Sequence, residues 1–216
     1  MRCYLVRHAQ TLRNQPLRFQ GRTDTLLSPF GLTQAQCLGA SFTGQTPGAI
    51  YSSPLQRCVQ TANAIASTTG AVVRIEPGLA EMDFGAWEGL TTADVERQFT
   101  RTYHEWLKAP SQVRIPDGEP CDQFRIRVRE AFVNIATRHH EEGCQELLIV
   151  SHGGVIASLL ADWLGADFDH LIRHVVLDNG GISVVEWRAN SSSVLWINAT
   201  IHLSQQIPHG AHWRGI

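Results

Sequence analysis

The chain has 216 residues, of which 43% are hydrophobic and 18% charged, and its formal net charge is −2. This length and apolar content suit one globular domain, which we expect to span residues 1–216, and exclude an intrinsically disordered chain. A net charge near zero gives no general electrostatic reason to bind nucleic acid or an anionic membrane. The cationic residues are uneven, because Lys108 is the only lysine among the 18 Lys and Arg, and ten histidines accompany them.

The sequence also bears on the compartment. The apolar run that starts at Cys3 is interrupted by Arg7 and His8, so it is too short for an export signal. The longest apolar tract, 155–164, contains Asp162 and cannot span a bilayer. Five dispersed cysteines without a C-x-x-C pair argue against a disulfide framework and against a thiolate zinc site. We therefore expect a cytoplasmic protein without a membrane partner.

The first third of the chain alternates strand and helix patterns. Residues 3–6 and 49–51 are short continuous apolar runs, which are typical of parallel strands covered on both faces. Apolar residues then recur at three- and four-residue spacing over 55–65, which predicts an amphipathic helix. Residues 72–75 form a weaker strand candidate. This order predicts a strand–helix–strand arrangement.

Residues 81–120 interrupt the alternation. They contain Phe, Trp and Leu in a proportion unlike that of a solvated tether, and a short helix is predicted at 91–99. The segment ends in the turn-forming run 116–120, Pro-Asp-Gly-Glu-Pro. We therefore expect an insertion that packs over the sheet. Its Trp and Phe side chains at 84–107 are expected to form a core beneath it, and the alternative is that some of them line a ligand pocket.

The second half of the chain resumes the alternation. A helical pattern at 124–135 precedes an apolar strand at 147–150, and 153–164 opens on two glycines before it becomes apolar, as a helix packed on a sheet does. Two further strands at 182–187 and 194–197 flank the polar stretch 189–192, which predicts a hairpin. The whole order predicts an α/β fold with a mainly parallel central sheet and helices on both faces.

Polar residues gather where three predicted strands end. Arg7 and His8 follow the first strand, Arg57 lies in the first helical turn after the second, and His152 and Gly153 follow the strand 147–150. In an open parallel sheet the ligand crevice lies outside the carboxyl ends of the strands. Arginine side chains, imidazoles and helix N-termini suit a phosphoryl group. A metal ion fits this site poorly, because no matching carboxylates occur at these strand ends. We also expect no cofactor.

These residues are part of a longer pattern that resembles the histidine phosphatase superfamily, also called the phosphoglycerate mutase-like family. The blocks that carry the resemblance are, in chain order, Arg7-His8-Ala9, Asn14, Gln20-Gly21, Ser52-Ser53-Pro54-Leu55-x-Arg57, Glu81-x-x-Phe84-Gly85-x-Trp87-Glu88-Gly89, Gly118-Glu119 and Ser151-His152-Gly153-Gly154. They cover most of the chain, and the block at 84–89 resembles the phosphatase branch. Two positions depart from the family, since Ala9 replaces a usual glycine and Pro120 a usual serine.

The resemblance implies a phosphoglycerate mutase-like fold and a role for each matched residue. His8 would attack phosphorus and form a phosphohistidine, which requires an unprotonated ring nitrogen. The resemblance also implies catalytic roles for Arg7, Arg57 and His152, which would contact the equatorial phosphoryl oxygens. The substrate-binding positions that it implies are Asn14, Gln20, Gly21 and Gly153. Glu81 would be the general acid for the leaving alcohol and then the base for water, and Asp83 and Glu88 are the nearby alternatives.

The resulting functional hypothesis is a metal-independent phosphatase that hydrolyses a small phosphorylated metabolite. Phosphoserine ranks first among named substrates, and α-ribazole phosphate or a sugar or glycerate phosphate is the alternative. A phosphoglycerate mutase is less expected, because mutases of the family carry a longer insertion between the acid and the second histidine. A non-catalytic phospho-ligand binding module would need an incomplete catalytic set, and the set here is complete.

Several features receive a structural interpretation. Residues Arg125, Arg127 and Arg129 are interpreted as a solvated helix face, and His170 and His174 as surface or rim residues rather than metal ligands. The C-terminal histidines His202, His209 and His212 either contact a carboxylate on the substrate or lie on the surface. Related proteins are often dimers, so a homodimer is a further expectation, although the sequence leaves the oligomeric state open.

Overall fold

The computed structural model describes residues 1–14, 17–188 and 191–203, and a six-stranded sheet of order β3-β2-β4-β1-β5-β6 runs through its centre. The strands are β1 (Arg2–Arg7), β2 (Ala49–Ser52), β3 (Val73–Ile75), β4 (Glu146–Ser151), β5 (Ile182–Glu186) and β6 (Ser193–Ala199). β1 to β4 are parallel, whereas β5 is antiparallel to β1 and β6 is antiparallel to β5. The predicted mainly parallel sheet and the C-terminal hairpin are confirmed, while positions 189–190 of the hairpin turn lie outside the described residues.

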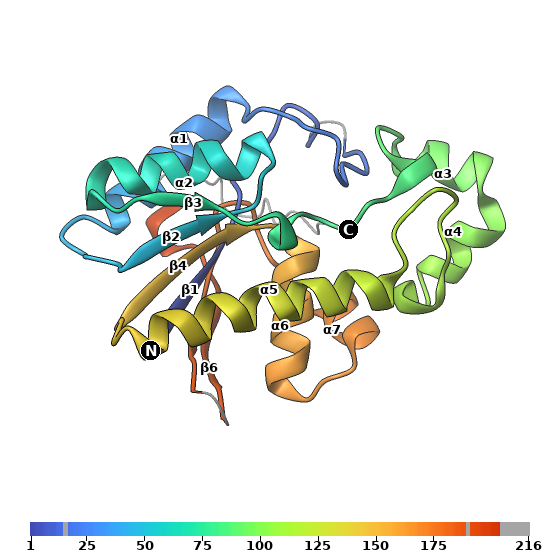
Figure 1. The fold of residues 1–216 in the computed structure, drawn as a ribbon. Coiled ribbons are helices and arrows are strands. Elements are labelled where there is room, and N and C mark those ends of the chain that lie inside the picture. Colours follow the sequence, from blue (N-terminus) through green and yellow to red (C-terminus); the bar gives the residue numbers. More distant parts are fainter. Residues whose placement is uncertain (15–16, 189–190, 204–216) are drawn as a thin grey trace.

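Helices cover both faces of this sheet (Figure 1). They are α1 (Pro29–Ser41), α2 (Gln56–Thr69), α3 (Thr92–Gln98), α4 (Thr100–Trp106), α5 (Cys121–Glu141), α6 (Gly153–Leu164) and α7 (Phe168–His174). α1 and α2 lie on one face, and α5 and α6 lie on the other (Figure 1). The α/β class and the helices predicted at 55–65, 91–99, 124–135 and 153–164 are confirmed.

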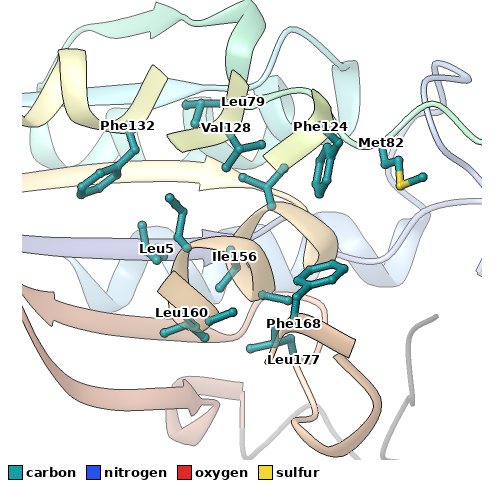
Figure 2. Packing of buried hydrophobic residues seen from close by; sticks show 14 of the residues in the cluster. Leu5, Leu79, Met82, Phe124, Val128, Phe132, Ile156, Leu160, Phe168 and Leu177 are labelled. Carbon is teal, nitrogen blue, oxygen red and sulfur yellow. The ribbon is translucent and has the colours of Figure 1, made fainter. Parts of the chain in front are cut away.

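The central strands supply apolar side chains to both faces because successive residues of a strand point in opposite directions. In β1, Val6 packs with α1 and α2, whereas Leu5 packs with α5 and α6. Figure 2 shows Leu5 on the same side as Val128 of α5 and Ile156 of α6. Each fully buried aliphatic side chain contributes roughly 1.5–3 kcal/mol. A continuous apolar run is therefore what a strand buried on both faces requires.

The sequence pattern did not indicate α1. Its buried face is built from small and polar residues such as Gly31, Gln34 and Ala35, so it has little apolar periodicity. Ser28 marks its start, since its side chain accepts a hydrogen bond from the backbone N–H of Gly31. The close packing of α1 on α2 favours the small residues, because a Cβ at Gly39 would lie 2.5 Å from the carbonyl oxygen of Ala64.

The insertion expected at 81–120 contains α3 and α4, which lie beyond the carboxyl ends of the parallel strands (Figure 1). Trp87 is completely buried at its centre and makes edge contacts with the rings of Phe19, Tyr103 and Trp106, at centroid distances of 5.1, 6.1 and 5.6 Å. The predicted aromatic core of the insertion is confirmed. Because Phe19 belongs to the N-terminal loop, this core fastens the insertion to the segment that follows β1.

Candidate active site

The strand register brings His8 and His152 together. Arg7 at the end of β1 pairs with Ser151 at the end of β4, so the next residue of each strand is one of the two histidines. Their rings meet edge to face with centroids 5.3 Å apart, and both side chains are buried. β2 lies on the other side of β4 and leads into α2, which carries Arg57 in its first turn. The predicted convergence of these strand ends is confirmed.

One hydrogen bond determines which nitrogen of His8 carries a proton. Nδ1 lies 2.8 Å from the carbonyl oxygen of Ala9, and because a carbonyl can only accept, Nδ1 is the donor. The neutral ring then has its free lone pair on Nε2. Burial, followed by the positive charges of Arg57 and Arg7, holds the pKa of His8 well below its usual 6.5. His8 is therefore a neutral base with a defined nucleophilic atom at pH 7.

Arg57 is positioned by backbone carbonyls of the loop after β1. Its Nη2 donates to the oxygen of Gly21 at 2.7 Å and its Nη1 to that of Thr23 at 3.0 Å. Its Nε lies 3.3 Å from Nδ1 of His152, which must therefore accept. The proton of His152 is then on Nε2, which donates to Oγ of Ser53 at 2.7 Å. Gly21, expected to bind substrate, contributes to the site by holding Arg57.

Arg7 has an unpaired donor in the site. Its Nη1 donates to the carbonyl oxygen of Leu177, while its buried Nε has no hydrogen-bond partner among the described residues. A Cβ at Gly153 would lie 3.5 Å from Cζ of Arg7, so the start of α6 lies directly against the guanidinium. Leaving a buried guanidinium N–H unpaired is costly, and an anion at this position would satisfy it.

Asn14 and Gln20 belong to the loop that encloses this edge of the sheet. The Oδ1 of Asn14 accepts hydrogen bonds from the backbone N–H and the hydroxyl of Thr11, at 2.7 and 2.9 Å. The same hydroxyl lies 2.9 Å from Oε1 of Gln20. Both predicted residues are therefore brought to the loop next to His8, where their hydrogen bonds stabilise the loop itself.

The structure separates Glu81 from the two alternative carboxylates. Glu81 lines a pocket with an empty volume of about 360 Å³, including its opening to solvent. The residues that line this pocket are Arg7, Glu81, Gly153, Gly154, Ala157, Ile172, Val175 and Leu177. Asp83 instead accepts the backbone N–H of Gly85, and Glu88 accepts the backbone N–H groups of Arg22 and Thr23. Of the three carboxylates, only Glu81 lines this pocket together with Arg7, a residue predicted to bind the phosphoryl group.

Glu81 is also the carboxyl whose environment favours protonation. Burial raises its pKa above the usual value, against the opposing effect of the backbone N–H groups of Met82 and Gly154, which donate to its oxygens at 3.0 and 3.2 Å. A Cβ at Gly154 would lie 2.6 Å from Oε1 of Glu81. The absence of a side chain at Gly154 therefore makes room for this carboxyl group.

The structure corrects the interpretation of the arginine run on α5. Arg125 and Arg129 both pair with Asp162, and Arg127 pairs with Glu119 at 2.6 Å and donates to backbone carbonyls at 78–81. The three arginines are therefore paired, on two sides of the helix, and do not form one solvated face. A signal was present, because position 127 lies three residues after Phe124, on the side of the helix that packs against the sheet.

The structure describes three of the five other histidines that the sequence analysis singled out. His170 and His174 are exposed on α7 with ring centroids 4.4 Å apart, and in the described ranges no group of three or more His, Cys, Asp and Glu could hold a metal ion. His202 donates to the carbonyl oxygen of Gly180 at 3.0 Å. His209 and His212 lie outside the described residues.

In the part of the chain that the structure covers, no helix is both long and apolar enough to cross a membrane.

Comparison with known proteins identifies the family. The model of the histidine phosphatase superfamily (branch 1) matches residues 3–200. The chain belongs to this superfamily. It is 30% identical to phosphoserine phosphatase 1 of Hydrogenobacter thermophilus, over 93% of each chain. It is also 30% identical to a protein of Yersinia pestis named probable phosphoglycerate mutase GpmB, over 87% of this chain and 86% of the other.

Among solved structures, the α-ribazole phosphatase of Shigella flexneri superposes on this histidine phosphatase with a TM-score of 0.82 at 28% identity, covering 92% of this chain and 96% of that one. The resemblance inferred from the motif blocks and the phosphoglycerate mutase-like fold it implies are both confirmed. The family and its phosphatase-named members support a phosphoric monoester hydrolase.

Proposed function

We propose that this histidine phosphatase hydrolyses a small phosphomonoester through a phosphohistidine at His8. The observation that carries the proposal is the His8 ring itself, neutral and with its lone pair on Nε2, next to Arg57 and His152. Attack by Nε2 forms the N–P bond as the bond from phosphorus to the leaving oxygen breaks, and Glu81 gives its proton to that oxygen. Glu81 then takes a proton from water, whose oxygen attacks phosphorus, so that phosphate leaves and Nε2 regains its lone pair.

The cationic groups of the site take the part that a metal ion takes in other phosphatases. Arg7 and Arg57 supply fixed N–H donors to the phosphoryl oxygens, and the unpaired Nε of Arg7 is available for this contact. His152 is the third proposed catalytic contact to the phosphoryl group, and Asn14, Gln20, Gly21 and Gly153 form the proposed substrate-binding set. We therefore expect catalysis without a metal ion or a cofactor.

Relatives named as phosphatases of small metabolites support a small substrate. Phosphoserine is our first choice of substrate, because a relative that is 30% identical to this chain is named phosphoserine phosphatase. The alternatives are α-ribazole phosphate, after the phosphatase of similar structure, and sugar or glycerate phosphates. The mutase alternative shares the phosphohistidine and differs only in the acceptor, which is a second hydroxyl instead of water. A cytoplasmic location and a homodimer stay predictions, and sedimentation would test the dimer.

A phosphate-release screen over small phosphoesters tests this function. The purified protein should release phosphate at an undiminished rate in the presence of EDTA. Loss of activity that added metal restores would contradict the metal-free reaction. Isomerisation of 3-phosphoglycerate in place of phosphate release would favour the mutase.

The pH dependence of kcat/KM should be bell-shaped, with each limb assigned to one residue. His8 must be neutral, and its pKa lies well below 6.5, so activity should fall only well below that pH. Glu81 must be protonated, and its pKa is raised above 4.5, so activity should fall again as pH rises through that raised value. The profile is corrected for the second ionisation of the substrate phosphate at about pH 6. Glu81→Gln should lose the alkaline limb, whereas an acid limb at or above 6.5 would contradict the state assigned to His8.

A further inference from the structure

Arg127 of α5 uses every donor of its guanidinium group. Its Nε and Nη2 bind the two carboxylate oxygens of Glu119 at 2.6 and 2.7 Å. Its Nη1 donates to the carbonyl oxygens of Gly78 at 3.0 Å and Ala80 at 2.7 Å, and Nη2 also donates to that of Glu81 at 2.9 Å. These five contacts match the five N–H groups of arginine. A side chain whose donors are all engaged holds its partners in one arrangement.

The three carbonyl groups belong to the short segment that carries Glu81. Residues 77–79 form one turn of 3-10 helix, and the chain then continues without regular structure through Glu81. The carbonyl groups of this part of the backbone are not paired in a sheet or an α-helix, so side chains supply their hydrogen-bond donors. Besides Arg127, the hydroxyl of Ser151 donates to the carbonyl oxygen of Leu79 at 2.7 Å. The backbone that sets the direction of the Glu81 side chain is thus bound to α5 and to the end of β4.

Glu119 keeps the guanidinium of Arg127 in the required plane. Two parallel N–H···O bonds between an arginine and a carboxylate fix the relative orientation of both groups. Glu119 also approaches Nη2 of Arg22 at 3.4 Å and the backbone N–H of Asp83 at 3.4 Å. The side chains of Glu119 and Arg127 are 12% and 21% exposed, so solvent screens their attraction less than it would on the surface.

We propose that Arg127 is a positioning residue for the general acid, holding the backbone at 78–81 so that the Glu81 carboxyl group faces the leaving oxygen. The inference rests on the acid role proposed for Glu81. Arg127 binds the carbonyl of Glu81 and not its carboxyl group, so it acts through Glu81. Lysine cannot substitute, because a single ammonium group cannot bind three carbonyl oxygens and a carboxylate in one plane.

The test compares substrates that differ in their need for an acid. An alkoxide leaves from phosphorus only when it is protonated, whereas p-nitrophenolate leaves without a proton. We expect Arg127→Gln to lower kcat/KM for an alkyl phosphate about 10- to 100-fold, a part of the ~10²–10⁴-fold that a general acid supplies. For p-nitrophenyl phosphate the same variant should keep kcat/KM within about 3-fold of the parent. The constant kcat/KM is used because it reports the phosphorylation of His8 and not the later attack of water.

Two further variants and a control make the result specific. Arg127→Lys and Glu119→Gln should show the same selective loss, and the rate on p-nitrophenyl phosphate shows that each variant is folded. Arg129→Gln is the matched control, because this residue lies two positions further on α5 and pairs with Asp162 instead. It should leave both substrates unaffected.

Equal losses on the two substrates in the Arg127 variants would overturn the inference. The Glu81→Gln variant distinguishes a failure of the positioning role of Arg127 from a failure of the acid role of Glu81. If Glu81→Gln is selective for the alkyl phosphate and Arg127→Gln is not, only the positioning role of Arg127 is wrong. If Glu81→Gln also affects both substrates equally, the acid role proposed for Glu81 is wrong, and the role of Arg127 is wrong with it.

Discussion

His8→Ala is expected to reduce phosphate release by about 10⁴- to 10⁶-fold, the range seen when the nucleophile of a covalent mechanism is removed. The expected loss is large because alanine has no ring nitrogen, so the variant lacks the lone pair on Nε2 that would attack phosphorus. Arg7 and Arg57 would still bind the substrate phosphate, so KM should change much less than kcat. Phosphate release from a phosphoester substrate measures the effect.

A direct measurement of the intermediate accompanies this variant. Substrate labelled with radioactive phosphate should label the parent protein, and the label should survive base and be lost in acid, as a phosphoramidate is. His8→Ala should take up no label. His170→Ala is the matched control, because His170 is exposed on α7 and should not affect the rate. Base-stable label on the His8→Ala variant, or a rate close to that of the parent, would rule out His8 as the nucleophile.

Arg57→Lys is expected to lower kcat by about 10²- to 10³-fold, the usual effect of losing one donor to transition-state charge. Arg57 is 1% exposed, and its three nitrogens each have a partner, on Gly21, Thr23 and His152. Lysine has one nitrogen and no fixed plane, so it cannot keep those partners while it binds a phosphoryl oxygen. Because the substitution preserves the positive charge, the fall in kcat measures the contribution of the planar arrangement of N–H donors in Arg57.

Inhibition by orthovanadate separates this effect from a loss of folding. Vanadate takes the five-coordinate geometry of the transition state, so its inhibition constant should rise in parallel with the fall in kcat, whereas KM should change less. Arg138→Lys, an exposed position near the end of α5, is the control and should resemble the parent. An Arg57→Lys variant with kcat within about 10-fold of the parent would show that the fork of Arg57 is not required.

Much of the fold followed from local patterns. The apolar runs of β1, β2 and β4 are buried on both faces, and such strands carry a clear signature because their side chains form a nearly continuous apolar run. The helices α2 and α5 were predicted from their periodicity, and α6 from two glycines followed by an apolar stretch. α1 was not, because it packs closely against α2 through Gly39 and other small residues, which give no apolar period.

The candidate site divides in the same way. Arg7, His8, Arg57 and His152 could be predicted because each directly follows a strand or begins the next helix, and parallel strands bring those ends to one edge. Glu81 could be proposed only by resemblance, since nothing local distinguishes it from Asp83 or Glu88. Gly154 is one of the residues that line its pocket, and burial by distant parts of the chain raises its pKa.

The sequence by itself determined the fold class, the family and the chemical nature of the site. Each of these depends on residue type and on order along the chain. The preference for arginine over lysine bears on the predicted phosphate site only at Arg7 and Arg57. The tertiary structure decided which nitrogen of His8 is free, which of three carboxylates meets Arg7, and that Arg127 holds the backbone of Glu81. The physical reason is that each of these facts depends on the direction of a side chain and on its distance from a partner, which tertiary packing sets and no local pattern encodes. Nδ1 of His8 binds the carbonyl of the neighbouring residue, whereas Arg127 and Glu81 are 46 positions apart.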